Sequence, residues 1–306
     1  MSNIWIVCEQ ADVAAQLLTP ALELAAGKPV YAITVGAENA SKIAALGASK
    51  VWQLNLQDGR PESAVKVIAD TIKEQGASVV LFGATPRGRG IAATVAALLE
   101  AGMASEVSAI NAAADGIEAQ RYILGGVAVS TLAFAGLSCV TVTPNTFAAP
   151  EAAASAGEIV AVDVPADSRV TVVETAPVAS EGVDLAAAPR VVCVGRGVEK
   201  QEDLAMVQDL CSAFGAEIAC SRGIAEDLKW LPLERYIGIS GVKVKADIHI
   251  SLGISGQVQH VAGIRDAKTI IAVDTNENAP IFAAADYGIV GNLYDVVPAL
   301  TKALKG

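Results

Sequence analysis

The chain is short of several residue types that common functions require. Only two of its 306 residues are histidines, 4% are aromatic and 18% are charged. Acidic residues outnumber basic ones by 33 to 22, and the formal net charge is −11. An acidic surface repels phosphate backbones, and few aromatic rings are left for stacking on bases. These shortages argue against a general nucleic-acid-binding protein.

The cysteines lack the spacing of common metal sites. No two of the five form a CxxC pair; they are Cys8, Cys139, Cys193, Cys211 and Cys220. A zinc ribbon or an iron–sulfur cluster uses such pairs, so neither is expected. An odd number of dispersed cysteines is typical of reduced thiols in a reducing compartment. With so few histidines as further ligands, we expect no metal site.

The sequence also lacks the signals of export and of a membrane span. Its first ten residues, MSNIWIVCEQ, show neither a basic start nor a long apolar core. A long uncharged stretch covers residues 122–150, but Thr, Ser, Gly, Pro and Asn interrupt it, and its Val and Thr pairs favour strands. We therefore expect consecutive buried strands there, and a soluble, cytoplasmic protein without membrane insertion.

Apolar residues are abundant, at 53%, and the length suits two domains. The first hundred residues alternate short apolar runs with helical periodicity. Strands are predicted at 4–7, 30–35, 51–54 and 78–82, and helices at 13–26, 41–46, 62–75 and 91–101. This alternation predicts a mostly parallel sheet with helices on both faces.

The sequence pattern changes between residues 105 and 175, where helical periodicity fades. Short β-like runs at 127–132, 139–142, 158–164 and 171–174 predict an antiparallel or mixed extension of the first sheet. Residues 176–189, APVASEGVDLAAAP, have two prolines and no apolar periodicity, which predicts an interdomain linker.

A second alternating unit follows the linker. Strands are predicted at 191–194, 217–219, 248–252 and 269–273, and helices at 203–214, 257–262 and 293–304. We expect an α/β fold of two doubly wound domains: an N-terminal α/β domain at 1–188, whose mostly parallel sheet carries a β extension, and a C-terminal domain at 189–306. Sheets of this kind bind ligands beyond the carboxyl ends of their strands.

Three loops at predicted strand ends in the second domain are rich in glycine and polar residues. VGRG (194–197) has the Gly-x-Gly of a phosphate turn but not GxGxxG, so a plain tight turn is equally compatible. In CSRG (220–223), Arg222 suits an aromatic ring or a phosphate, or a surface ion pair. In GISGQVQH (253–260), Ser255 is predicted to cap a helix whose start favours an anion.

The two histidines and one further loop complete the candidates. His260 lies close after the Gly/Ser loop, where its imidazole could hydrogen-bond a ligand or serve only the core. His249 lies within an apolar strand and is interpreted as structural. In residues 81–93, Arg87 and Arg89 precede a helix, where they bind an anion or, as we favour, lie near a partner protein.

Together these segments resemble the alpha subunit of electron transfer flavoproteins. LGISGQVQH (252–260) is similar to the flavin-site signature of that family. It is joined in the same order by VGRG (194–197), CSR (220–222), YIGISG (236–241), NAPIFAAADYGIV (278–290) and VVPAL (296–300). The likeness extends more weakly to residues 83–93 and 122–128. It is greatest to short bacterial alpha subunits associated with acyl-CoA metabolism.

The resemblance implies that the second domain is a Rossmann-like domain that binds one FAD. Arg222 would lie over the isoalloxazine ring with Ser221 beside it, Ser240 near the flavin N5 edge, and His260 near the C2 carbonyl. The other implied cofactor contacts are Tyr236, Ile237, Ile239, Gly253, Ser255, Gly256, Gln259, Asp274, Asn292 and Leu293.

Three positions depart from the family pattern. Relatives usually have Asn in place of Asp274 and Asp in place of Asn292, an exchange that compensates only if the two side chains share a neighbourhood. Several relatives have Gln in place of Ile239. We expect these departures to affect the adenosine-side contacts and the flavin potential rather than FAD binding itself.

The resemblance also implies a function and partners. Arg222 and His260 would place positive charge or hydrogen-bond donors against the flavin and stabilise its anionic reduced forms. The chain would shuttle electrons between flavoenzymes such as acyl-CoA dehydrogenases and another redox partner, without transforming a small substrate. It would form a heterodimer with a beta subunit through the first domain. Some relatives bifurcate electrons from NADH with a second FAD, and the sequence leaves that open.

Two other functions fit the fold alone. An NAD-dependent or thiamine-enzyme-like enzyme would need a catalytic acid–base pair, and only His260 is available for one. A nucleotide-binding regulatory module without redox chemistry predicts a colourless protein that binds free adenine nucleotide. Neither explains why Arg222, Ser240 and residues 252–260 occur together in one order.

Overall fold

The computed structural model describes residues 3–176 and 184–306, which form two compact units, Met1–Thr175 and Ala176–Gly306. The predicted linker lies partly outside the described residues. Within its described part, Leu185 and Ala188 are buried in a core of the second unit. The end of the predicted linker is therefore packed against the second unit.

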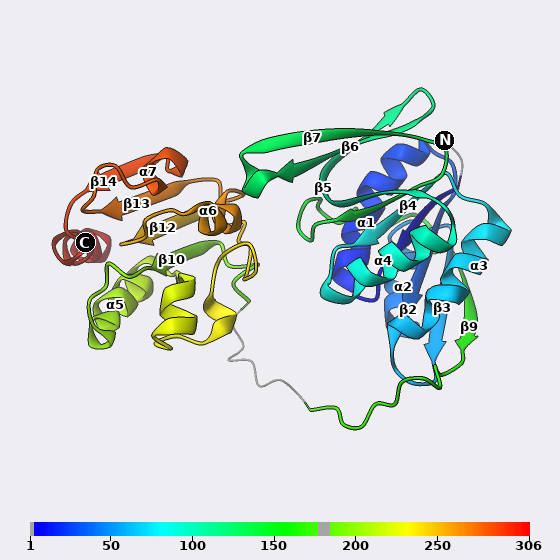
Figure 1. Cartoon of the computed structure of the whole chain (residues 1–306), viewed down its shortest axis with the longest axis horizontal. Helices are drawn as coiled ribbons and strands as arrows, with labels where there is room; N and C mark the ends of the chain where they lie inside the picture. The colour runs from blue at the N-terminus through cyan, green and yellow to red at the C-terminus, as the bar shows by residue number, and fades with distance from the viewer. Residues whose placement is uncertain (1–2, 177–183) are drawn as a thin grey trace. The chain divides into compact units, whose positions relative to one another are not determined.

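The first unit contains one nine-stranded sheet in the order β7-β6-β5-β8-β4-β1-β2-β3-β9 (Figure 1). Its parallel part consists of β1 (Ile4–Val7), β2 (Val30–Val35), β3 (Lys50–Leu56), β4 (Val79–Gly83), β8 (Ser138–Val142) and β9 (Glu158–Val164). The extension consists of β5 (Gly102–Ala113), which is parallel to β8, and the antiparallel β6 (Gly116–Ile123) and β7 (Ala128–Ala135). The predicted mixed extension is confirmed.

Helices cover both faces of this sheet, as the alternation predicts. One core contains α1 (Ala11–Ala25) and α2 (Ala37–Ala45), and the other contains η1 (Pro61–Ala64), α3 (Val65–Gln75) and α4 (Pro86–Leu98). In β1, Ile4 and Ile6 belong to the first core, whereas Trp5 and Val7 belong to the second. A strand covered on both faces needs apolar residues at every position, which explains the continuous apolar run.

Several predictions for residues 105–175 need correction. Residues 171–174 form no strand, and β9 pairs with β3 at the opposite edge from the extension. Within the stretch 122–150, β8 is buried at every position as predicted, whereas β7 alternates half-buried and exposed residues, so only part of the prediction of buried strands is confirmed. The reason is that β7 is an edge strand of the sheet, whereas β8 lies inside the sheet with side chains in the cores on both faces. Among the described residues, no helix is long and apolar enough to span a membrane.

The second unit contains a parallel five-stranded sheet in the order β11-β10-β12-β13-β14. Its strands are β10 (Arg190–Val194), β11 (Glu217–Cys220), β12 (Ile248–Leu252), β13 (Ile270–Asp274) and β14 (Tyr287–Val290). One core contains α5 (Leu204–Phe214) and α8 (Leu293–Lys305), and the other receives α6 (Val258–Ile264) and α7 (Ile281–Ala284). Because β10 lies between β11 and β12, the chain reverses direction across the sheet at β10. A ligand crevice is expected at this reversal.

Candidate functional site

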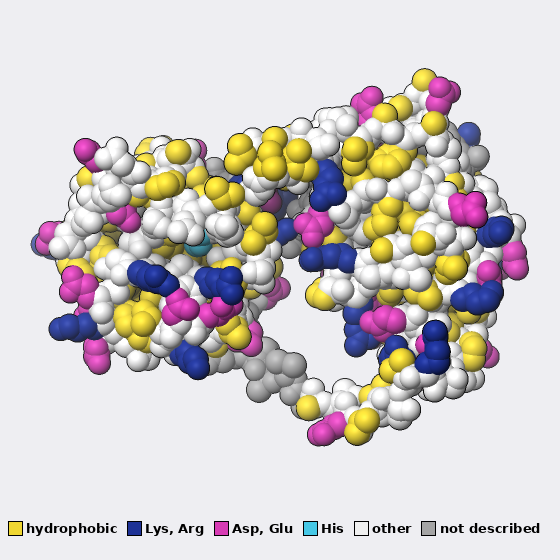
Figure 2. Space-filling model, in the orientation of Figure 1, with side chains coloured by type: hydrophobic (Ala, Val, Ile, Leu, Met, Phe, Trp, Pro, Cys, Tyr) yellow, Lys and Arg dark blue, Asp and Glu magenta, His cyan; other side chains and the backbone are white. Residues whose placement is uncertain are grey.

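A cleft of about 750 Å³ lies at the carboxyl ends of β10, β11 and β12. This volume falls in the range of small-molecule and cofactor sites, roughly 300–1,000 Å³. Its walls are the loops after these three strands together with residues 236–240. Figure 2 shows basic and acidic side chains next to each other on the second unit, and histidine only as a small patch. Because the carboxyl end of β10 is the point at which the strand order reverses, the cleft lies where the topology of the sheet predicts a ligand.

Two glycine loops form the floor of the cleft through direct backbone contact. The N–H of Gly195 donates to the carbonyl of Leu252 at 2.9 Å, and the N–H of Gly197 donates to the carbonyl of Gly253 at 3.0 Å. Gly253 has φ +60°, and a Cβ there would lie 2.6 Å from the Cα of Gly197. Any side chain at Gly253 would force these loops apart, so the floor can be built only from glycine.

Arginine–carboxylate pairs lie along one wall. Arg222 begins a single π-type turn, Gly223–Asp227, and its Nε donates to Glu226 Oε2 at 2.6 Å. In the same turn, Asp227 accepts a hydrogen bond from Arg196. The pKa of the Arg222 guanidinium is raised above its usual value by the hydrogen bond that it donates to Glu226 and by the negative charge of that carboxylate. Arg222 is thus a fixed positive charge whose side chain is 66% exposed beside the cleft.

Residues 236–240 lie between the end of β11 and α6 and are hydrogen-bonded to both. The N–H of Ile237 donates to the carbonyl of Cys220 at 3.0 Å, and the N–H of Ile239 donates to the carbonyl of Gln259 at 2.8 Å. The hydroxyls of Tyr236 and Ser240 lie 3.2 Å apart. These contacts hold an otherwise irregular segment in place, so that Ile239 and Ser240 form part of the cleft wall.

The start of α6 differs from the prediction. The helix begins at Val258, and its N-cap is Gln257, whose side chain makes no capping hydrogen bond. Gly256 has φ +81° and turns the chain, and Ser255 lies outside the helix, where its carbonyl accepts from the N–H of Ile281. The predicted Ser255 cap is therefore wrong. A seven-residue helix without that cap gives no support for an anion site at its start.

His260 is buried in the cleft wall and uncharged. It is 8% exposed, and its Nδ1 lies 3.2 Å from the carbonyl oxygen of Ile237. A carbonyl only accepts, so Nδ1 bears the proton in this contact, and the neutral ring has a bare Nε2. That Nε2 is buried and has no partner among the described residues. Burial lowers the pKa of His260 to about 4, so the expected positive charge is not present on the free chain at neutral pH.

His249 lies next to His260. It is fully buried in β12, its Nε2 is 3.1 Å from the hydroxyl of Ser251, and burial followed by the charge of His260 lowers its pKa to about 3. Cys193 on β10 and the two histidines can each bring one polar atom within 4.8 Å of the others. Sequence reasoning missed this cluster because its members come from two strands and a helix that only the fold brings together.

At the far side of the sheet, Asp274 and Asn292 occupy neighbouring positions. Asp274 pairs with Val290 across β13 and β14, and its carbonyl accepts from the N–H of Gly291. Each side chain accepts from a backbone N–H two residues ahead: Asp274 from Asn276 at 2.9 Å, and Asn292 from Tyr294 at 3.0 Å as the N-cap of α8. The two positions thus lie side by side at the carboxyl ends of β13 and β14.

Most residues named from the sequence line the cleft. These are Ser221, Arg222, Tyr236, Ile237, Ile239, Ser240, Gly253, Ser255, Gly256, Gln259, His260 and Asp274. Asn292 and Leu293 are not in its lining, and Leu293, the first residue of α8, is buried in a core of the second unit. Lining residues that were not named as contacts are Gly195, Arg196, Gly197, Gly223, Glu226, Asp227, Ile254 and Gln257. The Gly-x-Gly of 195–197 was the available signal for three of them.

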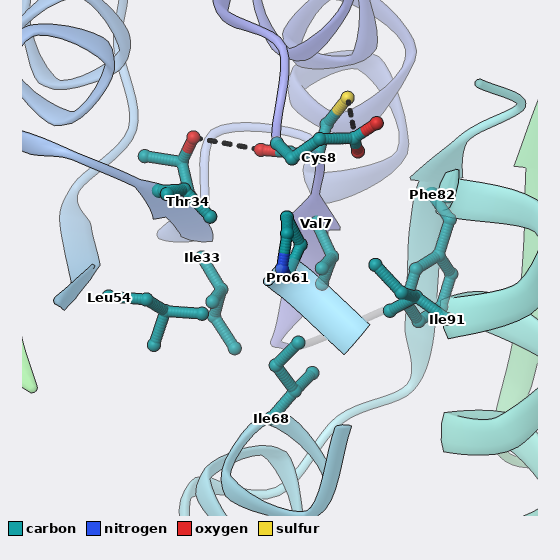
Figure 3. A pocket seen from close by; sticks show the side chains of 12 residues that line it. Val7, Cys8, Ile33, Thr34, Leu54, Pro61, Ile68, Phe82 and Ile91 are labelled. Carbon is teal, nitrogen blue, oxygen red and sulfur yellow. Dashed lines mark hydrogen bonds between the residues drawn. The ribbon is translucent and has the colours of Figure 1, made fainter. Parts of the chain in front are cut away.

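The cavity at the strand ends of the first unit is far smaller than the cleft of the second unit. A cavity of about 20 Å³, the size of one water molecule, lies among apolar side chains at the ends of β1, β2 and β4 (Figure 3). Near it, the Thr34 hydroxyl donates to the carbonyl of Cys8. Arg87 lies 3.6 Å from Glu62, and Arg89 lies 3.2 Å from Glu106. Both arginines are paired within the chain, which does not favour an anion site.

Known proteins resemble both units. Residues 4–167 match the family model "Electron transfer flavoprotein domain", and residues 184–265 match "Electron transfer flavoprotein FAD-binding domain". Protein FixB of Escherichia coli O157:H7 is 37% identical over 313 residues, covering 99% of this chain and 98% of that protein. Protein FixB of Shigella flexneri is also 37% identical over the same coverage.

A Rhodococcus jostii thiamine diphosphate-dependent 4-hydroxybenzoylformate decarboxylase is 12% identical with a TM-score of 0.26, over 96% of this chain and 54% of the decarboxylase. The family matches span both units, and the identity to FixB spans the whole chain. The chain therefore belongs to the electron transfer flavoprotein family, as an alpha subunit whose second unit is the FAD-binding domain.

Proposed function

We propose that the cleft holds FAD through the residues that line it, and that the chain passes electrons between flavoenzymes. FAD supplies the ability to accept and release one or two electrons. The observation that carries the proposal is the convergence of Arg222, Ser240 and His260 from three separate segments on one cleft with a glycine floor. These are the groups that the resemblance assigns to the flavin ring.

The cleft fits this cofactor on independent grounds. Its glycine floor admits close approach of backbone to a ligand, and the buried Nε2 of His260 needs a polar partner. Arg222 provides a planar cation for a flat ring system. Asp274 lies in the lining and Asn292 beyond it, which suits contacts to the part of the cofactor remote from the ring.

Each residue has a distinct role in this proposal. Arg222 brings a permanent positive charge that stabilises negative charge arriving in the cleft. His260 is neutral, and its bare Nε2 takes up a proton only when negative charge next to it raises the pKa of the ring. The side chain of Tyr236 is buried and fixes Ser240 through their hydroxyl contact. Together these residues stabilise the reduced form of the cofactor. The proposed electron transfer needs no binding of a small substrate.

The partners follow from the family. Alpha subunits of this family form heterodimers with a beta subunit, and we propose that the first unit provides that interface. Acyl-CoA dehydrogenase-type flavoenzymes are the proposed electron donors. Bifurcation of electrons from NADH is the alternative, and it would require a second flavin in the complex.

The test is the flavin content of the complex isolated from the native host through a tag on this chain. Visible absorbance and release of the cofactor by denaturation give the number of FAD molecules per heterodimer. One FAD supports a simple carrier, and two support bifurcation. An intact complex with no flavin would overturn the proposal and favour a regulatory nucleotide-binding module.

A further inference from the structure

Two buried histidines lie next to each other at the cleft: His260 is in its lining, His249 is not, and the proposed function uses only His260. The rings of His249 and His260 have centroids 6.3 Å apart, with 52° between their planes. Each ring has one nitrogen in a hydrogen-bonding contact, with Ser251 and Ile237 respectively. The second nitrogens, His249 Nδ1 and His260 Nε2, are buried without a partner among the described residues. Two such nitrogens in one cluster need a physical reason.

The surroundings of the pair contain little charge. In the sheet, His249 is flanked by Val191 on β10 and Ile270 on β13, which are both apolar and buried. β10 contains Arg190, whose Nη1 donates to the carbonyl of Phe214 on α5, and Cys193, which lies close to the two rings. Burial raises the pKa of the Cys193 thiol well above the usual value, so it stays neutral.

The charged groups nearby are few. Arg265 is the C-cap that follows α6, and Arg222 is in the cleft lining together with His260. The causes that lower the pKa of His249 include one charge, that of His260. For His260 the causes are burial and the carbonyl of Ile237, which acts in the opposite direction. His260 is thus the one charge that acts on His249, and the rings lie close enough for each to affect the protonation of the other.

We propose that His249 is a positioning residue for His260: from behind the ring that faces the cofactor, it offers a polar nitrogen that stabilises His260 when Nε2 takes up a proton. The inference deepens the proposed function and rests on it, because negative charge in the cleft draws the proton. The proton comes from solvent and forms one N–H bond at Nε2, while the Nδ1–H continues to donate to Ile237. Since positive charges on both rings would repel each other, His249 stays neutral when His260 is protonated.

An apolar side chain at position 249 would remove this support. Protonated His260 would then keep only the carbonyl of Ile237 and the cofactor as partners in a wall of low polarity. His260 should therefore need a lower pH to become protonated. A polar but uncharged side chain at position 249 should restore part of the effect.

The experiment uses the fact that the chain has only two histidines. The chain is labelled with 15N-histidine, purified through a tag without histidine, and studied in complex with an unlabelled beta subunit. The nitrogen shifts report the tautomer and the protonation of each ring. They are recorded against pH for the complex before and after reduction with dithionite. The variants are His249→Phe and, as the polar control, His249→Gln.

We expect His260 in the reduced complex to be half-protonated at least one pH unit lower in His249→Phe than in the unaltered chain. His249→Gln should recover at least half of that shift. An unchanged half-point in His249→Phe, a bare Nδ1 on His260, or a stoichiometric zinc ion bound to the rings would overturn the proposal. If His249→Phe does not fold, the smaller apolar variant His249→Leu replaces it, with the same shift expected and an unchanged half-point overturning the proposal.

The same samples separate this inference from the proposed function. Absorbance shows whether flavin is present. A chain without flavin defeats the proposed function, and the positioning role is then measured on the flavin-free chain by the shift in His260 protonation between the unaltered chain and His249→Phe. Flavin with an unchanged half-point defeats the positioning role alone.

Discussion

Arg222 Nε donates a hydrogen bond to Glu226 Oε2 at 2.6 Å, four residues along the same turn in the wall of the cleft. The two side chains are 66% and 36% exposed, so solvent screens the pair and it adds little to folding stability. The contact uses one edge of the guanidinium and leaves its flat face for a ring system. The hydrogen bond thus orients the Arg222 guanidinium and contributes little to the stability of the fold.

Glu226→Gln should raise the midpoint potential of the bound flavin. The substitution removes a negative charge beside Arg222, and the cleft then favours the more negative, reduced cofactor. We expect a several-fold change in that equilibrium, where a tenfold change corresponds to about 59 mV for one electron. Potentiometric titration measures it. Glu202→Gln, at an exposed carboxylate outside the cleft lining, is the control and should have no effect.

Arg222→Ala should lower the same potential. Hydrogen bonds with charged groups contribute roughly 1.5–3 kcal/mol, so the reduced cofactor should lose stability by tenfold or more relative to the oxidised one. Arg222→Lys keeps the charge but not the planar group, and should lie between the two. If Arg222→Ala left the potential unchanged, Arg222 would have no electrostatic role at the flavin.

Gly253→Ala should destabilise the second unit and weaken flavin binding. The added Cβ would lie 2.6 Å from the Cα of Gly197, and neither backbone can move without opening the floor of the cleft. Gly215→Ala is a matched control, because Gly215 also has a left-handed backbone, φ +64°, but its Cβ would meet only Arg190 Nη1 at 3.5 Å.

Both variants carry the backbone penalty of about 1–2 kcal/mol for a left-handed residue with a side chain. Only Gly253→Ala adds the collision. Calorimetry should therefore show a larger fall in the unfolding temperature of the second unit for Gly253→Ala, with loss of flavin. Equal falls for the two variants would show that the close approach of the loops is unimportant.

The layout of the fold could be predicted from the sequence because local patterns decide it. The continuous apolar run of β1 and the alternation of strands and helices require a parallel sheet covered on both faces. β5 was missed, since residues 102–113 contain Ser, Glu and Asn and no continuous β-branched run. That strand forms because β8 and β6 pair with it, and this tertiary context is absent from local sequence.

Most residues that line the cleft could be named from the sequence, but the protonation of His260 could not. The order of Arg222, Ser240 and residues 252–260 indicated the cleft wall. The spacing of Arg222 and Glu226 by four residues was a signal for their ion pair, although the turn is of the π type. The neutral state of His260 depends on burial and on the carbonyl of Ile237, twenty-three residues away. No local pattern contains that contact.

The second unit should lose stability as the pH falls from about 6.5. Burial lowers the pKa of His249 to about 3 and of His260 to about 4, whereas both rings bind protons near pH 6.5 when unfolded. Between these values the unfolded chain holds more protons, so the free energy of unfolding rises with pH and is lost on acidification. The histidine contribution is fully present above pH 6.5.

His249→Phe isolates one of these two contributions. The variant should take up one proton fewer on unfolding between pH 6.5 and 4.5, so its stability should depend less steeply on pH. Calorimetry at several pH values measures this, with the transition of the second unit assigned through Gly253→Ala. Identical pH slopes for His249→Phe and the unaltered chain would contradict a buried, neutral His249.

Asp274→Asn and Asn292→Asp should compensate each other in FAD binding. The two positions share one edge of the sheet, and each side chain already accepts from a backbone N–H that the exchanged residue can also satisfy. Asn292→Asp alone places a carboxylate at the N-terminus of α8, which should stabilise that helix by about 0.3–1 kcal/mol. It also adds a second negative charge at the edge that contains Asp274, and should weaken FAD binding. The double variant restores one acid and one amide, so its affinity for FAD should exceed the value expected from adding the two single effects. Simple additivity in calorimetric FAD titrations would show that the two side chains do not act on the cofactor together.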